Sequence, residues 1–267
     1  MGTLNVTPDS FYDGGRFYGL KKALDRARCM IKDGVDIIDV GGESTRPGSK
    51  PVSESEELKR VIPVIKELSK EIDKPISIDT YKAGVADKAI EAGAKIVNDV
   101  SGLSDESGMA KVVAARGVPV VIMHIKGRPH NFPMSPHYGD LISEINLFFE
   151  RKIEFALQAG IPDNKLLLDP GIGFGKTMKH NLEILRRLAE LNCHKLPIMV
   201  GTSRKSFISK VMKPLEEDDH SPYNSQFVGT LVTLVIAMSN GAKIVRVHDV
   251  KEAVYAKKMY NAIQNPN

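Results

Sequence analysis

The sequence predicts an α/β fold, a single (β/α)8 TIM barrel that occupies residues 1–267 as one domain. Eight short apolar runs each end in a polar residue, and segments long enough for a helix separate them. The length of 267 residues matches one barrel of this kind, which takes about 250. All strands of a parallel barrel open their carboxyl ends onto one face, where ligands bind. The polar endings are therefore expected to converge on one pocket.

The eight runs are the expected strands. In order they are Thr3–Asn5, Ile37–Asp39, Ile76–Asp79, Ile96–Asp99, Val120–His124, Leu166–Asp169, Ile198–Lys205 and Ile244–His248. The first run is short, because only Gly2 to Asn5 precede the loop that follows. We expect a first strand that is truncated at the N-terminus and that closes the barrel less firmly.

Helix boundaries carry their own signals. Ser53 and Glu56 form a capping-box pattern that predicts the start of an amphipathic helix running to about Glu71. Glycines follow four helical segments, where a left-handed residue closes a helix. These are Gly34, Gly93, Gly117 and Gly160. The repeated order of helix, glycine and apolar run is typical of a parallel α/β fold.

Two segments at the expected catalytic face are longer than a barrel needs. One runs from Thr7 to Gly19 and the other from Gly41 to Val52, and both are rich in glycine. We expect mobile loops over the site after strands 1 and 2. A third insertion, Lys213 to Gln226, is acidic and is expected to be a solvated connection.

The composition excludes several classes of protein. The net charge is only +4, and basic residues are interleaved with acidic ones, which argues against a nucleic-acid partner. The longest apolar stretch, Leu231 to Met238, is too short to cross a membrane, and the N-terminus does not resemble a signal peptide. A cytoplasmic location is expected. Cys29 and Cys193 are too far apart for a CxxC site and are expected to be small buried hydrophobes.

Three polar residues end the third, fourth and sixth runs: Asp79, Asn98 and Asp169. Carboxylates and an amide on one wall can hold a flat heterocycle with amidine-like N–H groups. The alternative is that each one caps the following helix. Their equivalent positions at three strand ends favour the binding site.

Cationic residues end the last two runs. Arg204 and Lys205 are adjacent, so one is expected to line the pocket while the other points outward. Arg246 and His248 are expected on one face of the last strand, where with Asn5 they could bind a phosphate or diphosphate. A solvated basic turn and a core histidine are the alternatives.

The glycine-rich segment Asp169 to Thr177 resembles a phosphate loop only superficially, because Pro170 occupies the first glycine position of that motif. We interpret its glycines as letting the backbone approach a ligand. The histidines at 124, 130 and 137 are too irregularly spaced for a zinc site, and a surface loop is expected there.

Seven motifs together resemble the dihydropteroate synthase family. They are Asn5–Phe11 with Asp13–Gly15, Gly41–Gly48, Ser77–Thr80, Asn98–Gly102, Asp169–Lys176, Gly201–Phe207 and Arg246–His248. Their order and rough spacing hold along the whole chain. Arg128, where the family commonly has threonine, and the long 213–226 connection depart from the pattern.

The resemblance implies a pterin-binding transferase of folate biosynthesis and a sulfonamide target. It would condense 6-hydroxymethyl-7,8-dihydropterin diphosphate with p-aminobenzoate, using Mg²⁺, as a homodimer formed through the late helices. It assigns Asp79, Asn98, Asp169, Lys205 and Met123 to the pterin. It assigns Asn5, Arg246 and His248 to the diphosphate, with Asn5 also contacting Mg²⁺.

For the second substrate the resemblance points to the two long loops. Phe11, Thr45, Arg46, Pro47 and Ser206 would surround p-aminobenzoate, and Asp13 would help organise the closed complex. The catalytic set implied is Asp13, Asp79, Lys205, Arg246 and His248. The diphosphate would leave while the arylamine attacks the pterin methylene, without a covalent protein intermediate.

Three rival functions share parts of this pattern. A pterin-dependent methyltransferase would have the carboxylate–amide set but lack both loop motifs, and a non-catalytic pterin-binding protein would lose the diphosphate ligands. A Schiff-base aldolase would use Lys205 as a desolvated amine, which borohydride trapping with a carbonyl substrate detects. The motifs present favour the synthase.

Overall fold

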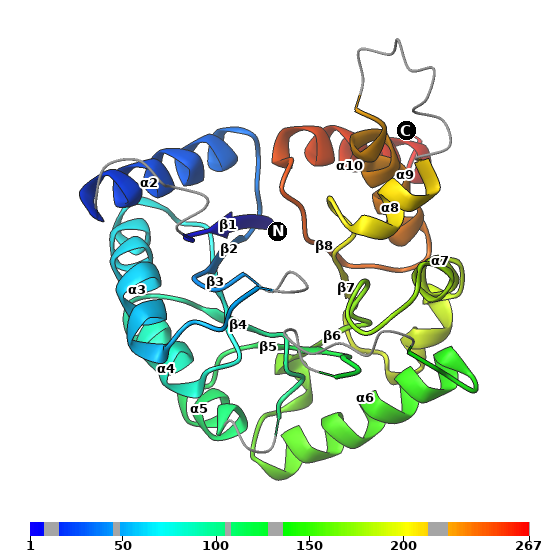
Figure 1. Cartoon of the computed structure of the whole chain (residues 1–267), viewed down its shortest axis with the longest axis horizontal. Coiled ribbons are helices and arrows are strands. Elements are labelled where there is room, and N and C mark those ends of the chain that lie inside the picture. The colour runs from blue at the N-terminus through cyan, green and yellow to red at the C-terminus, as the bar shows by residue number, and fades with distance from the viewer. Residues whose placement is uncertain (8–15, 45–48, 105–107, 128–135, 213–223, 267) are drawn as a thin grey trace.

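The computed structural model of the chain describes residues 1–7, 16–44, 49–104, 108–127, 136–212 and 224–266. Eight parallel strands form an inner ring, and the helices surround it in chain order (Figure 1). The strands are β1 (Gly2–Asn5), β2 (Ile38–Gly41), β3 (Ile76–Asp79), β4 (Ile96–Asp99), β5 (Val120–Met123), β6 (Leu166–Asp169), β7 (Met199–Val200) and β8 (Ile244–Val245). The predicted (β/α)8 barrel is confirmed, with a strand at each of the eight apolar runs.

Backbone pairing runs around the whole ring. Strands β1 to β6 pair in sequence order, and β7 pairs with β8. The two parts are joined by parallel bridges between Leu168 and Ile198 and between Gly2 and Val247. Thr3 N donates to Val247 O at 2.8 Å, which closes the ring. Strand β1 has four residues, as β2 has, and pairs with β2 along its whole length.

In the described ranges, the outer layer consists of helices and two short 3₁₀ turns. The helices are α2 (Arg16–Lys32), α3 (Glu54–Glu71), α4 (Ala83–Glu91), α5 (Met109–Arg116), α6 (Leu141–Gln158), α7 (Met178–Arg186), α8 (Ser206–Met212), α9 (Ser225–Ser239) and α10 (Val250–Gln264). The 3₁₀ turns are η1 (Asp163–Lys165) and η2 (Leu188–His194). Helices α8 to α10 lie side by side beyond β7 and β8 (Figure 1).

Helix α3 begins and ends where the sequence predicts. Ser53 is its N-cap and accepts a hydrogen bond from Glu56 N at 3.3 Å. The Glu56 carboxylate, however, accepts from Arg60 Nε at 3.0 Å. The four predicted glycine positions all have positive φ, at 91° for Gly34, 123° for Gly93, 64° for Gly117 and 90° for Gly160, a region that strongly favours glycine.

Apolar side chains fill the barrel below its mouth. Met1, Val121 and Met199 form a buried cluster with Ile37, Leu167 and Ile244. Since strand residues alternate between faces, Val120 and Ile122 point the other way and join the larger core between the strands and the helices. The interior is therefore packed, and the polar strand ends lie above it.

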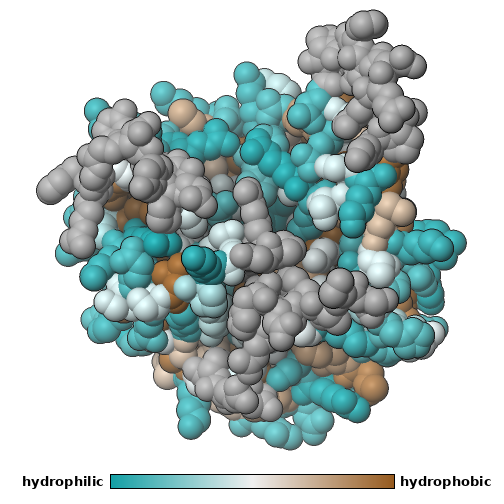
Figure 2. Space-filling model, viewed as in Figure 1, coloured by the Kyte–Doolittle hydropathy of each residue, from teal (hydrophilic) through white to brown (hydrophobic). Residues whose placement is uncertain are grey.

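Two further observations concern the surface. Cys29 and Cys193 are free and exposed, so the expectation that they are buried was wrong. Cys29 lies on the solvent-exposed side of α2, and Cys193 lies on the solvent-exposed side of η2. Of the helices in the described ranges, none is long and apolar enough to span a membrane. The described side chains at the rim of the face in Figure 2 are mainly hydrophilic.

Candidate active site

One row of polar residues crosses the mouth of the barrel. Strand pairing aligns Asn5 with Gly41, Gly41 with Asp79, and Asp79 with Asn98. Gly41 leaves a gap in this row: a Cβ there would lie 3.7 Å from both Asn5 Oδ1 and Asp79 Oδ2. The predicted residues of β1, β3 and β4 thus meet at one edge, and the glycine makes room between them.

A single guanidinium binds two carboxylates at the centre of the mouth. Arg246 Nε donates to Asp39 Oδ2 at 2.6 Å, and Arg246 Nη2 donates to Asp79 Oδ2 at 2.6 Å. Asn98 Nδ2 also donates to Asp39 Oδ2, at 3.1 Å. Burial opposes the charge on Arg246, but the two carboxylates outweigh it and raise its pKa. We call Asp39, Asp79, Asn98 and Arg246 the floor cluster.

Asp79 has a strongly perturbed carboxyl. Burial raises its pKa to about 7; Arg246 opposes that rise and the neighbouring Asp39 adds to it. Asp79 Oδ1 and Asp39 Oδ1 are both buried without a hydrogen-bond partner among the described residues. A buried acceptor left unpaired costs about 1–3 kcal/mol. These oxygens are therefore well placed to accept N–H groups from a ligand.

Asp169 and Lys205 form the opposite side of the mouth. Asp169 Oδ1 accepts from Gly171 N at 2.7 Å, and burial raises its pKa against the opposing charge of Lys205. Lys205 donates to the carbonyl of Ile172, and burial lowers its pKa to about 8 although Asp169 opposes this. Its Nζ lies 4.7 Å from the centre of the Phe174 ring. The amine is thus bound to a carbonyl and lies over an aromatic ring, within the electrostatic influence of Asp169.

The two adjacent cations point apart as predicted, but strand alternation is not the reason, because β7 ends at Val200 and both residues lie in the turn that follows. Arg204 has a side chain that is 54% exposed and pairs with Asp249, whereas Lys205 turns inward. Arg204 has a φ of 58°, a left-handed conformation uncommon for a residue with a side chain. This turn separates the two side chains.

The glycine-rich segment after β6 approaches protein backbone, and our interpretation that its glycines face a ligand was wrong for two of them. A Cβ on Gly171 would lie 2.0 Å from His124 O, and one on Gly175 would lie 2.1 Å from Lys126 O. A Cβ on Gly173 would lie 3.1 Å from Lys205 Cδ. These glycines let the segment pack against the chain after β5 and clear space for Lys205.

His124 is buried, so the surface-loop interpretation was wrong for this histidine; His137 is exposed as expected. Lys176 Nζ lies 2.9 Å from His124 Nδ1 and donates to the carbonyls of His124 and Phe174 at 3.2 and 3.1 Å. Burial, together with the charges of Lys176 and Lys126, lowers the pKa of His124 to about 2. The neutral ring and Lys176 hold the ends of β5 and β6 together.

The remaining predicted residues surround this centre. Asn5 is half-buried at the end of β1, Met123 is buried beside Asp169, and Ser206 is exposed at the start of α8. His248 N donates to Ser203 Oγ at 3.2 Å, and its Nδ1 lies 3.0 Å from the same oxygen. Strand β8 ends at Val245, so Arg246 and His248 lie beyond the strand. Arg246 contacts Asp39 and Asp79, whereas His248 contacts Ser203.

Five predicted site residues lie outside the described residues. These are Phe11, Asp13, Thr45, Arg46 and Pro47. The same holds for most of the 213–226 connection. No group of three or more His, Cys, Asp or Glu side chains that could hold a metal ion occurs within the described ranges.

Sequence reasoning missed Asp39. Its side chain is completely buried and orients both Asn98 and Arg246. The signal was present, because Asp39 ends an apolar run as Asp79 and Asp169 do. The sequence analysis nevertheless gave it no role in the site, and the strand in fact continues for two residues beyond it to Gly41.

Comparisons with known proteins agree with this geometry. Residues 1–248 match the family model described as pterin binding enzyme. The chain is 46% identical to a dihydropteroate synthase of Escherichia coli over 262 residues, 98% of this chain and 90% of that relative. A crystal structure of the dihydropteroate synthase of Clostridium difficile with pteroic acid matches with a TM-score of 0.89 and 47% identity, covering 98% of this chain and 95% of that one. The Yersinia pestis dihydropteroate synthase with a sulfonamide drug matches with a TM-score of 0.90 and 46% identity, covering 99% and 93%.

Proposed function

This chain belongs to the dihydropteroate synthases within the family of pterin-binding enzymes, and from that premise we propose how its residues divide the reaction. The protein is a transferase that condenses 6-hydroxymethyl-7,8-dihydropterin diphosphate with p-aminobenzoate. The products are 7,8-dihydropteroate and diphosphate, a step of folate biosynthesis. The comparisons favour this activity over the methyltransferase and non-catalytic alternatives.

Asp39, Asp79 and Asn98 of the floor cluster, together with Lys205, are proposed to bind the pterin. The observation that carries this proposal is the buried, unpaired Oδ1 of Asp79 beside Asn98 at the barrel mouth. A pterin presents N–H donors on one edge and ring acceptors on the other, which suits two carboxylates, an amide and an amine. Asp169 and Met123 complete the proposed pocket, since they are paired across β5 and β6.

Asn5, Arg246 and His248 are proposed to bind the diphosphate. A guanidinium carries five N–H donors, so the two bonds from Arg246 to Asp39 and Asp79 leave others for phosphate oxygens. The contact of His248 Nδ1 with Ser203 fixes the orientation of that ring. The cations would stabilise the charge that develops on the leaving group.

Magnesium is expected with the diphosphate. Mg²⁺ usually keeps several waters and binds through one or two protein oxygens plus substrate phosphates. The half-buried Asn5 fits such a site, because its Oδ1 lies at the mouth beside Asp79. When bound, the ion would supply positive charge that makes diphosphate a better leaving group.

The arylamine is proposed to bind above the pterin between the two long loops. Phe11, Thr45, Arg46, Pro47 and Ser206 would contact it, and Asp13 would help order the complex. The methylene C–O bond breaks with its electron pair leaving on diphosphate. The amine forms the new C–N bond and releases one proton. Positioning of the two substrates and stabilisation of the leaving charge would supply most of the catalysis.

A homodimer through the late helices is also proposed. Large apolar side chains are exposed on one stretch of α9 and on α10: Val228, Val232, Val235, Ile236, Tyr255, Met259 and Ile263. The two helices lie side by side (Figure 1), and exposed apolar patches of this kind commonly mark interfaces. Sedimentation of the purified protein tests the dimer. A cytoplasmic location remains our expectation.

Diphosphate release tests the proposed function. The purified protein is incubated with Mg²⁺, pterin diphosphate and p-aminobenzoate, and diphosphate and dihydropteroate are measured together. We expect equal amounts of both products and no dihydropteroate when the arylamine is omitted. Absence of both products under these conditions would contradict the proposal.

A further inference from the structure

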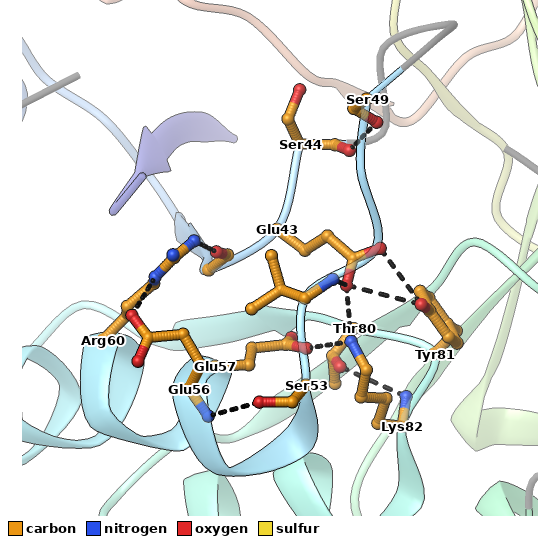
Figure 3. A network of polar contacts seen from close by, with 12 residues as sticks. Glu43, Ser44, Ser49, Ser53, Glu56, Glu57, Arg60, Thr80, Tyr81 and Lys82 are labelled. Atoms are coloured by element: carbon orange, nitrogen blue, oxygen red, sulfur yellow. Dashed lines mark hydrogen bonds and ion pairs between the residues drawn. The ribbon is translucent and has the colours of Figure 1, made fainter. Parts of the chain in front are cut away.

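The ends of the second long loop are tied together by hydrogen bonds. This loop leaves β2 at Gly41 and returns to α3. Glu43 Oε2 accepts from Val52 N at 3.0 Å, and Ser49 Oγ donates to Ser44 O (Figure 3). The four residues between Ser44 and Ser49 therefore start and end at fixed points. Arg60 Nη1 adds a bond to Gly42 O at 2.9 Å.

A nearly buried lysine fixes this loop base to the neighbouring strand. Lys82 Nζ lies 2.5 Å from Glu43 Oε2 and 2.5 Å from Glu57 Oε2. Tyr81 OH donates to Glu43 Oε1 at 3.0 Å. The side chains of Lys82, Glu43 and Glu57 are only 13%, 9% and 1% exposed. We call Glu43, Glu57, Tyr81 and Lys82 the loop anchor (Figure 3).

The loop anchor is continuous with the pterin side of the mouth. Glu43 lies two residues after Gly41, which is the residue between Asn5 and Asp79 in the strand row. Tyr81 and Lys82 follow Asp79 after a single residue, Thr80, whose Oγ1 accepts from Lys82 N at 3.2 Å. The same turn after β3 therefore carries Asp79 into the mouth and Lys82 to the loop.

Burying the charges of the loop anchor carries a desolvation penalty. Burial opposes the charge on Lys82, yet its hydrogen bonds to Glu43 and Glu57 outweigh that effect and raise its pKa. Well-packed apolar residues often replace a buried ion pair without loss of stability. Apolar residues could not, however, form the directional bond from Lys82 that orients the Glu43 carboxylate, which in turn accepts from Val52 N.

We propose that Lys82 and Glu43 are positioning residues for the second substrate, acting by holding the base of the loop that carries Thr45, Arg46 and Pro47. The inference rests on the proposed function, which assigns those three residues to p-aminobenzoate. Fixing the residues on either side of 45–48 limits the conformations open to that segment, so contact with the substrate costs less conformational entropy. Loss of the bond between Lys82 and Glu43 should therefore weaken arylamine binding and leave pterin binding intact.

Steady-state kinetics of Lys82→Met test this inference. We expect KM for p-aminobenzoate to rise roughly tenfold while the affinity for pterin diphosphate, measured by calorimetry, changes less than about twofold. Lys82→Arg keeps the charge and should restore much of the arylamine affinity. The matched control is Lys88→Met, which removes an exposed Lys–Glu pair from α4 and should leave both constants unchanged.

Two milder variants keep the test decisive if Lys82→Met does not fold. Glu43→Gln preserves the shape and an oxygen for Val52 N but loses the charge facing Lys82, and Tyr81→Phe removes one bond. Each should raise the arylamine KM by a smaller factor. An arylamine KM equal to that of the parent in every folded variant, or equal rises for both substrates, would overturn the inference. A parent protein that forms no dihydropteroate would instead overturn the proposed function.

Discussion

The floor cluster and the loop anchor have the same ingredients, one cation between two carboxylates, but differ in how many acceptors they leave open. In the floor cluster, Asp39 and Asp79 each keep a buried oxygen without a partner in the described structure. In the anchor, both oxygens of Glu43 are used, by Tyr81, Val52 and Lys82. Only Glu57 Oε1 lacks one there, again counting described residues alone. The floor cluster thus keeps two open carboxylate oxygens at the barrel mouth and the anchor keeps one, so the floor cluster is the better placed of the two to accept N–H groups from a ligand.

The cation differs as well. Arg246 presents a planar fork that reaches two carboxylates through separate nitrogens and still has donors to spare. Lys82 is a point charge that both carboxylates approach at 2.5 Å. A guanidinium suits a site that must also meet a diphosphate, whereas an ammonium suits a compact, closed contact.

The largest effect is expected on stability at the anchor. Lys82→Met leaves Glu43 and the fully buried Glu57 without their cation, which should lower the free energy of unfolding by about 3–5 kcal/mol. Urea denaturation measures this change. Lys88→Met, at an exposed pair, should change it by less than about 1 kcal/mol. Equal small losses in both variants would show that the anchor does not stabilise the fold.

The next effect concerns turnover. Arg46→Ala should spare pterin binding and slow condensation by roughly 10–100-fold, because the second substrate is no longer well oriented. Calorimetry with pterin diphosphate and the rate of dihydropteroate formation separate the two effects. Wild-type turnover would rule out a role for the second loop.

A pH effect should distinguish the floor cluster. The folded pKa of Asp79 is about 7 against an ordinary value of 3.8. The folded state therefore binds more protons than the unfolded state between pH 4 and 7, so this carboxyl makes the unliganded protein less stable as pH rises through that window. The slope cannot exceed about 1.4 kcal/mol per pH unit for one proton.

Asp79→Asn provides the control for this slope. Denaturation of parent and variant between pH 4 and 8 should show that the variant loses less stability with rising pH. Lys205 does not affect this comparison. Because its pKa is lowered from 10.5 to about 8, the folded and unfolded states differ in protonation of Lys205 mainly between pH 8 and 10.5, above the tested range. Parallel pH profiles would mean that Asp79 is not the group responsible.

The smallest effect is expected for Tyr81→Phe. The variant loses one hydroxyl donor to Glu43, which should cost about 0.5–1.5 kcal/mol in unfolding free energy. The anchor keeps its ion pairs, so the loss should be well below that of Lys82→Met. A loss as large as that of Lys82→Met would mean that Tyr81, and not the lysine, holds the loop.

Much of this arrangement could be predicted from the sequence. The apolar runs predicted all eight strands, because a parallel barrel strand is buried on both faces. Asp79 and Asp169 end their strands as predicted, and Asn98 lies one residue before the end of β4. Capping by Ser53 and the four glycine turns are local, so they were also predictable.

What escaped prediction depends on contacts between distant segments. Asp39 touches Asn98 and Arg246, which lie 59 and 207 residues away along the chain. Lys82 meets Glu57 across 25 residues, and no local pattern announces that pairing. The glycines at 171 and 175 were misread because their crowding partner is the backbone after β5.

Calorimetric titration of pterin diphosphate into the parent, Asp79→Asn and Lys82→Met tests the central distinction most directly. Loss of a charge-assisted bond to the heterocycle should weaken binding to Asp79→Asn by about 3 kcal/mol or more, which removes detectable binding at ordinary concentrations. Lys82→Met should bind as the parent does. Unchanged affinity in Asp79→Asn, or equal losses in the two variants, would contradict the division of the mouth into an open binding cluster and a closed support.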